Sequence, residues 1–88
     1  MPTIHLLIKG KVQGVFYRAS AKKIALELNL EGWIKNREDG NVEAVVTGTE
    51  TGINQFVGWC SQGPAKASVT SLTKTEITSL NFSSFTIK

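Results

Sequence analysis

Residues 10–18 carry side-chain types whose spacing suits the binding of a phosphate group. A glycine-containing turn leads here into a predicted helix, whose first amide N–H groups lack partners and whose dipole adds partial positive charge. Such a turn is a natural anion cradle, and Gly14 permits close approach of a ligand or a positive φ angle. Arg18 adds a planar guanidinium that stays charged and can hold two phosphate oxygens. Taken alone, the segment fits an ordinary strand-to-helix turn with an exposed arginine at least as well, and it matches neither a P-loop nor Gly-x-Gly-x-x-Gly.

Apolar residues on either side of this turn predict the elements that would position it. Ile4, Leu6 and Ile8 alternate with other residues, which predicts a strand over residues 3–9. Helical spacing of apolar residues predicts a helix over 17–28, and Asn29 follows where a left-handed residue often ends a helix. Strands are predicted over 32–37 and 41–48, joined by a hairpin that contains Asp39 followed by glycine.

The second half of the chain repeats the pattern of helix and strand. Ile53, Phe56, Val57 and Cys60 fall at helical spacing and predict a helix over 51–62. Residues 68–77 are rich in Ser and Thr with imperfect alternation, so we expect an edge strand or a bulge there. A last strand is predicted over 82–88. The order predicts an α+β, ferredoxin-like (βαββαβ) fold, with two helices on one face of a mostly antiparallel sheet of four to five strands.

Charge is unevenly distributed along the chain, whose net charge is +3. Residues 9–37 contain seven basic and two acidic residues, a net charge of +5, whereas the remaining three basic and five acidic residues give −2. Positive potential on one part of the chain favours an anionic partner. A solvated basic surface explains the same distribution equally well.

The other residues with reactive side chains favour structural roles. Cys60 is the single cysteine and fits a small core residue within a helix. His5 is the single histidine and lies mid-strand, while Asp39 fits the hairpin turn and Glu43 fits strand pairing. No cluster of cysteine and histidine suggests zinc.

Two segments resemble the signatures of the acylphosphatase family. Residues 10–18, Gly-Lys-Val-Gln-Gly-Val-Phe-Tyr-Arg, resemble the signature Gly-x-Val-Gln-Gly-Val-x-Phe-Arg. Residues 32–43, Gly-Trp-Ile-Lys-Asn-Arg-Glu-Asp-Gly-Asn-Val-Glu, resemble the signature Gly-Trp-Val-x-Asn-x-x-Asp-Gly-x-Val-Glu. A Gly-Pro-x-x-Ala-x-Val match over 63–69 and the closing Phe-Thr-Ile extend the resemblance over essentially the whole chain. Tyr17 departs from the pattern, because phenylalanine is usual before the arginine.

The resemblance implies a ferredoxin-like fold and hydrolysis of acyl phosphates without metal or cofactor. It implies that Arg18 holds the phosphate and that Asn36, otherwise readable as a strand-end cap, positions the attacking water with its side-chain amide. Phosphoryl oxygens are expected on the main-chain amides of the loop, namely Gln13, Gly14, Val15, Phe16, Tyr17 and Arg18. The leaving carboxylate has a conjugate acid pKa near 4, so no general acid is needed. The loose transition state then requires mainly that the protein position the reactants and stabilise the charge on the phosphoryl oxygens.

Two other functions stay open at this point. A ferredoxin-like domain could bind nucleic acid, although the aromatic run typical of RNA-binding sheets is missing. A catalytically idle anion-binding domain could carry the same loop. Because no leader or apolar run of about 18 residues is present, we expect a cytoplasmic single domain over residues 1–88. We further expect it to act as a monomer on a small acyl phosphate, with inorganic phosphate as product and no membrane partner.

Overall fold

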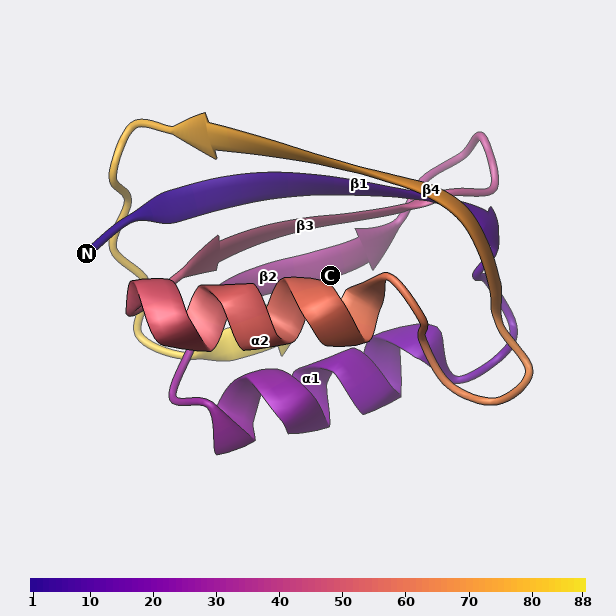
Figure 1. Cartoon of the computed structure of the whole chain (residues 1–88), viewed down its shortest axis with the longest axis horizontal. Coiled ribbons are helices and arrows are strands. Elements are labelled where there is room, and N and C mark those ends of the chain that lie inside the picture. The colour runs from indigo at the N-terminus through magenta and orange to yellow at the C-terminus, as the bar shows by residue number, and fades with distance from the viewer.

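Five strands form one sheet in the spatial order β4-β1-β3-β2-β5, and two helices lie on one of its faces (Figure 1). The computed structural model describes all of residues 1–88. The elements, in chain order, are β1 (Thr3–Lys11), α1 (Tyr17–Glu27), β2 (Glu31–Asn36), β3 (Val42–Thr47), α2 (Glu50–Cys60), β4 (Ser68–Ile77) and β5 (Phe85–Ile87). All strand pairs are antiparallel except β2 with β5. This is the predicted α+β, ferredoxin-like arrangement.

The core forms between the helices and the inner face of β1, β3 and β2. Ile4, Leu6 and Ile8 alternate along β1 and are buried, as the sequence pattern predicted. Residues of the same parity on β3 are also buried, because antiparallel pairing sets Leu6 opposite Ala44. Phe56 of α2 closes the core against Phe85 of β5, with ring centroids 5.8 Å apart.

The ends of some strands differ from the sequence prediction, because pairing with neighbouring strands decides where each strand ends. β1 continues through Lys11, because Gly10 and Lys11 pair with the start of β4 after a register shift at Lys9. The sequence pattern predicted an edge strand or a bulge over 68–77, and the structure has both, since β4 lies at the edge of the sheet and its pairing with β1 is irregular. β5 is limited to Phe85–Ile87, whereas a strand over 82–88 was predicted.

The helix ends follow local chemistry. The Thr49 hydroxyl oxygen accepts a hydrogen bond from the Gly52 amide at 3.1 Å, so α2 begins at Glu50, one residue earlier than predicted. Asn29 has φ 58° after α1, which confirms the left-handed residue expected there. Neither helix has the length and apolar character that crossing a membrane would require.

This topology collects several segments at one end of the molecule. The end of β1, the connection to α1, the end of β2 and the β2–β3 hairpin all lie at the right of Figure 1. β5 runs parallel to β2, with Ile87 beside Ile34. The candidate site residues predicted from the sequence therefore lie at the same end of the molecule, although they come from separate parts of the chain.

Candidate active site

The connection between β1 and α1 has an unusual backbone conformation. Gly14 has φ 72° and Phe16 has φ 63°, both left-handed, while Val15 between them does not. Alternation of this kind turns successive amide N–H groups toward one concave side. A Cβ atom at Gly14 would meet no protein atom within 4 Å, so the glycine is required there by its φ angle and leaves the surface open to a ligand.

The amide groups of this loop are free to bind an anion. No amide N–H of residues 13–19 donates a hydrogen bond to another protein group, and the first helical bond runs from the Ser20 amide to the Phe16 carbonyl at 3.1 Å. The loop thus adds its own donors to the unpaired donors that every helix N-terminus has. The α1 dipole places partial positive charge at the same position. The loop has the donor pattern expected of a phosphate cradle.

Arg18 stands beside these amides as the second residue of α1. Its guanidinium forms no ion pair with any carboxylate of the protein, so its charge is available to a ligand. The side chain lines a cavity of about 280 Å³ at the mouth of the loop. The lining residues are Val12, Gly14, Phe16, Tyr17, Arg18, Ala19 and Ile87.

The loop is tied to the β2–β3 hairpin by the side chain of Gln13. Its Nε2 donates to the carbonyl oxygen of Arg37 at 2.8 Å and to that of Asn41 at 2.9 Å. Arg37 directly follows Asn36, so this clamp holds one end of the loop next to the end of β2. The sequence had assigned only the main chain of Gln13 to the site, and nothing in local spacing indicated this contact.

Asn36 is the last residue of β2 and lies opposite Val42, on the same side of the sheet as buried Ile34. Its Oδ1 atom is buried and has no hydrogen-bond partner in the protein. Buried polar oxygens are rarely left unpaired, because desolvation without a partner is costly. This acceptor is therefore suited to hold a water molecule or a ligand.

Arg18 and Asn36 lie at the same end of the fold but border different cavities. Asn36 contributes to a polar hollow of about 460 Å³ along the hairpin, not to the cavity of Arg18. Gln13 Nε2 holds the start of the loop beside Arg37, the residue after Asn36, and Arg18 follows the loop as the second residue of α1. The fold thus brings both predicted residues to one end, with the amide cradle connecting them.

Tyr17, the departure from the family pattern, anchors the start of α1. Its hydroxyl donates to the Cys60 carbonyl at 2.5 Å, and its ring lies 5.3 Å from that of Trp59. Burial raises the pKa of the Tyr17 hydroxyl well above its usual range. Burial also raises the pKa of the Cys60 thiol to about 12, which suits the structural role predicted for Cys60.

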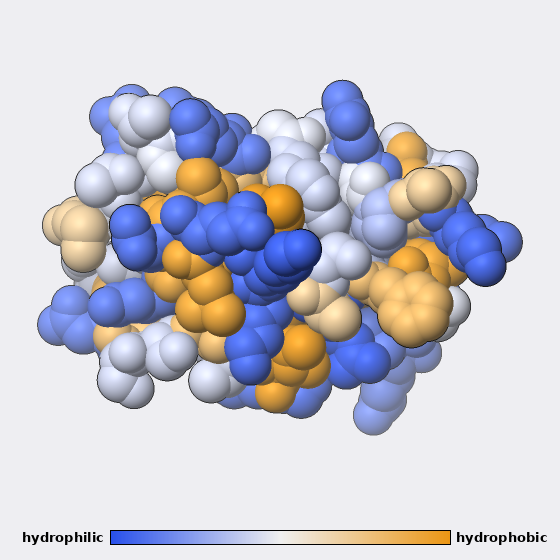
Figure 2. Space-filling view, turned by 90° about the horizontal axis from the view of Figure 1, so that it is seen from below, coloured by the Kyte–Doolittle hydropathy of each residue, from blue (hydrophilic) through white to orange (hydrophobic).

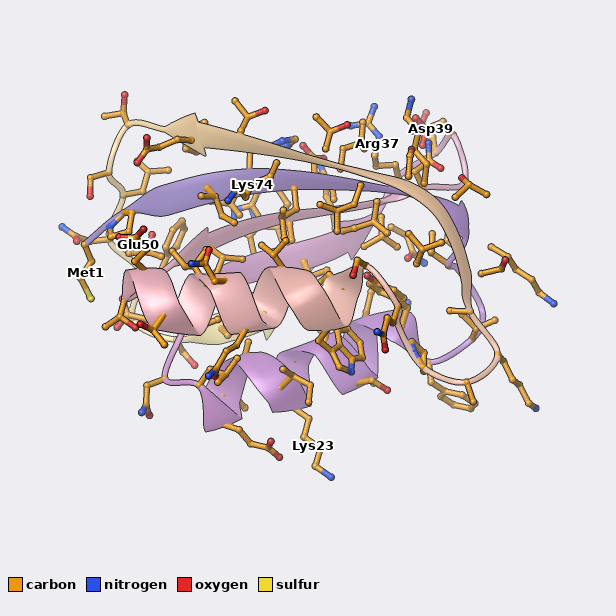
Figure 3. All side chains as sticks on the ribbon, viewed as in Figure 1. Met1, Lys23, Arg37, Asp39, Glu50 and Lys74 are labelled. Atoms are coloured by element: carbon orange, nitrogen blue, oxygen red, sulfur yellow. The ribbon has the colours of Figure 1, made fainter.

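The face of the sheet away from the helices carries a separate network of charges. Glu43 accepts a hydrogen bond from His5 at 2.7 Å and lies 3.4 Å from Arg37, which is itself paired with Asp39 (Figure 3). The His5 hydrogen bond is the main cause that lowers the pKa of Glu43. These residues stabilise the hairpin, as expected for Asp39 and Glu43. No group of three or more His, Cys, Asp or Glu side chains is arranged to hold a metal ion.

Comparison with known proteins identifies the family. The acylphosphatase family model matches residues 4–87. The chain belongs to the acylphosphatase family. The acylphosphatase of Albidiferax ferrireducens is 53% identical over 70 residues, which are 80% of this chain and 76% of that protein.

Solved acylphosphatases share the whole fold. The structure from Coxiella burnetii superimposes with a TM-score of 0.95 at 40% identity, covering 99% of this chain and 92% of that one. The structure from Bacillus subtilis gives a TM-score of 0.96 at 35% identity, covering 100% and 99%. The protein is an acylphosphatase enzyme and its substrate is an acyl phosphate, which decides against a catalytically idle domain or a nucleic-acid-binding module as its function.

Proposed function

We propose that this acylphosphatase binds the phosphoryl group on the free amides of the β1–α1 loop and on Arg18, and that Asn36 orients the attacking water. The run of unpaired N–H groups from residues 13 to 19 is the observation that carries the proposal. Arg18 contributes a full positive charge to the same cavity. A phosphoryl group offers three oxygens as acceptors, which matches a ring of donors around one guanidinium.

The chemistry requires little else from the protein. Water attacks phosphorus, the bond between phosphorus and the bridging oxygen breaks, and a carboxylate leaves with the bonding electrons. Because the carboxylate leaves unprotonated at neutral pH, no acid needs to donate a proton to it. Charge spreads over the equatorial phosphoryl oxygens in the loose transition state, where the loop amides and Arg18 stabilise it.

Asn36 supplies the direction of attack in this proposal. Its buried Oδ1 accepts a hydrogen bond from the water, which satisfies an atom that has no protein partner. The loop runs from Gln13, which is held beside Arg37, to Arg18 at the start of α1. The proposal therefore requires a phosphoryl group bound on the loop amides to be reached both by the Arg18 guanidinium and by a water held on the Asn36 amide.

We also propose that residues 1–88 act as one domain and as a monomer. A single hydrophobic cluster contains buried residues from both helices and from four of the strands. All the groups assigned to the site come from this one chain. Sedimentation of the active protein at assay concentration tests this assignment, and an active dimer would contradict it.

Hydrolysis of benzoyl phosphate in excess EDTA tests the catalytic proposal. We expect the wild-type protein to turn over, Arg18→Ala to lose roughly 10³–10⁵-fold in kcat, and Asn36→Ala to lose about 10²–10³-fold. Lys11→Ala is the matched control, because Lys11 is an exposed base on the same segment that lies outside the cavity. Near-wild-type activity of Arg18→Ala or Asn36→Ala would contradict the role of that residue.

A further inference from the structure

The cavity beside Arg18 is lined mostly by apolar side chains. Five of its seven lining residues are hydrophobic, and Arg18 is its single charged residue. A phosphate ion needs donors and positive charge but gains nothing from an apolar wall. An acyl phosphate, in contrast, joins a charged phosphoryl group to an acyl group that can be apolar.

Phe16 is the most exposed part of this wall. It is 76% exposed, so its ring adds little to the core. It also occupies the N-cap of α1 at φ 63° without a side-chain capping bond. A bulky residue is strongly disfavoured at positive φ, where glycine or asparagine is usual. Neither core packing nor backbone geometry explains a phenylalanine at this position, and strain of this kind clusters at functional sites.

Ile87 adds a second apolar side chain from the other end of the chain. It is 40% exposed and lines the same cavity as Arg18 and Phe16. Its position is set by pairing of β5 with β2, where the Lys88 amide donates to the Ile34 carbonyl at 2.9 Å. In Figure 2, hydrophobic surface appears at the right-hand end of the molecule, which carries the β1–α1 loop, as well as across the left and middle of this face.

We infer that Phe16 and Ile87 form the binding site for the acyl group and select acyl phosphates whose acyl group is apolar, aromatic ones above short ones. The inference rests on the proposed function, since it assumes that the phosphoryl group binds at Arg18 and the loop amides. The cavity volume of about 280 Å³ lies just below the range of drug-sized pockets and suits a small acyl group. The apolar wall then discriminates by burying the part of the substrate that does not react.

Paired kinetics with benzoyl phosphate and acetyl phosphate test this inference. The measured quantity is kcat/KM for benzoyl phosphate divided by kcat/KM for acetyl phosphate. A general loss of activity from a disturbed loop lowers both values and therefore cancels in this ratio. We expect Phe16→Ala to lower the ratio about 10-fold or more, and Ile87→Ala to lower it less. Phe16→Leu, which keeps an apolar side chain, should restore most of the ratio.

Two further variants separate the possible outcomes. Leu26→Ala removes another exposed apolar side chain, on α1 but outside the cavity, and should leave the ratio unchanged. Arg18→Ala should lower both kcat/KM values together. An unchanged ratio in Phe16→Ala would overturn the acyl site alone, whereas wild-type activity of Arg18→Ala would overturn the phosphate site on which it rests.

Discussion

The side-chain amide of Gln13 donates a hydrogen bond to the carbonyl oxygen of Arg37, 24 residues away along the chain, at 2.8 Å. With the companion bond to Asn41, it fastens the β1–α1 loop to the hairpin that follows Asn36. If the loop and Asn36 act on one phosphoryl group as proposed, this contact sets their relative position. Its loss should therefore affect catalysis more than folding.

Gln13→Ala should reduce kcat/KM by about 10²-fold, because a displacement of roughly 1 Å in a positioned group costs that much. The free energy of unfolding should fall by only about 1–2 kcal/mol, since one hydrogen-bonding side chain is lost. Steady-state kinetics and urea unfolding measure the two effects. Gln62→Ala, which changes an exposed glutamine on the α2–β4 connection, is the control. Wild-type kcat/KM in Gln13→Ala would show that the clamp does not position the loop.

Asn36→Leu should lower activity without lowering the free energy of unfolding. Activity should fall at least 10²-fold, because the water loses its acceptor. The free energy of unfolding should stay equal or rise by up to about 2 kcal/mol, because a buried oxygen without a protein partner is removed. Urea unfolding checks this expectation. A clear loss of stability would instead indicate that Asn36 serves the fold.

Tyr17→Phe should lower the free energy of unfolding and leave catalytic activity nearly unchanged. The variant leaves the buried Cys60 carbonyl without its partner, at a cost of about 1–3 kcal/mol, while the ring keeps its packing against Trp59. Urea unfolding measures the loss, and kcat/KM should change less than threefold. Modification of the Cys60 thiol at pH 8 should be slow in the wild-type protein, because burial raises the pKa of that thiol to about 12. Equal stability of the two proteins would argue against the hydrogen bond.

Glu43 should make stability depend on acid pH. Its pKa is lowered from 4.5 in the folded state, chiefly by the hydrogen bond from His5. The stabilisation is therefore fully present above about pH 4.5 and is lost as the pH falls through the folded-state pKa. Urea unfolding of Glu43→Gln between pH 7 and pH 3 should show a shallower decline than wild type. Glu76→Gln, which changes an exposed glutamate of β4 outside these ion pairs, should keep the wild-type profile.

Local periodicity was sufficient to predict most elements of the fold. Alternation placed Leu6 and Ala44 on buried faces, and helical spacing placed Ile53 and Phe56 in the core. These predictions succeed because the period of a strand or helix decides which side chains share a face. The edges of β1 and β5 were less well predicted, since pairing with β4 and β2 sets where those strands end.

The sequence by itself determined the order of the elements, the glycine-containing loop before α1, and the family motifs that carry Arg18 and Asn36. Only the tertiary structure decided that Gln13 clamps the hairpin, that the Asn36 oxygen lacks a protein partner, and that Phe16 shares a cavity with Ile87. The physical reason is the separation of the contacting residues along the chain. Local patterns report which face a residue occupies, whereas these contacts join residues far apart along the chain and depend on how the sheet pairs and the helices pack on it.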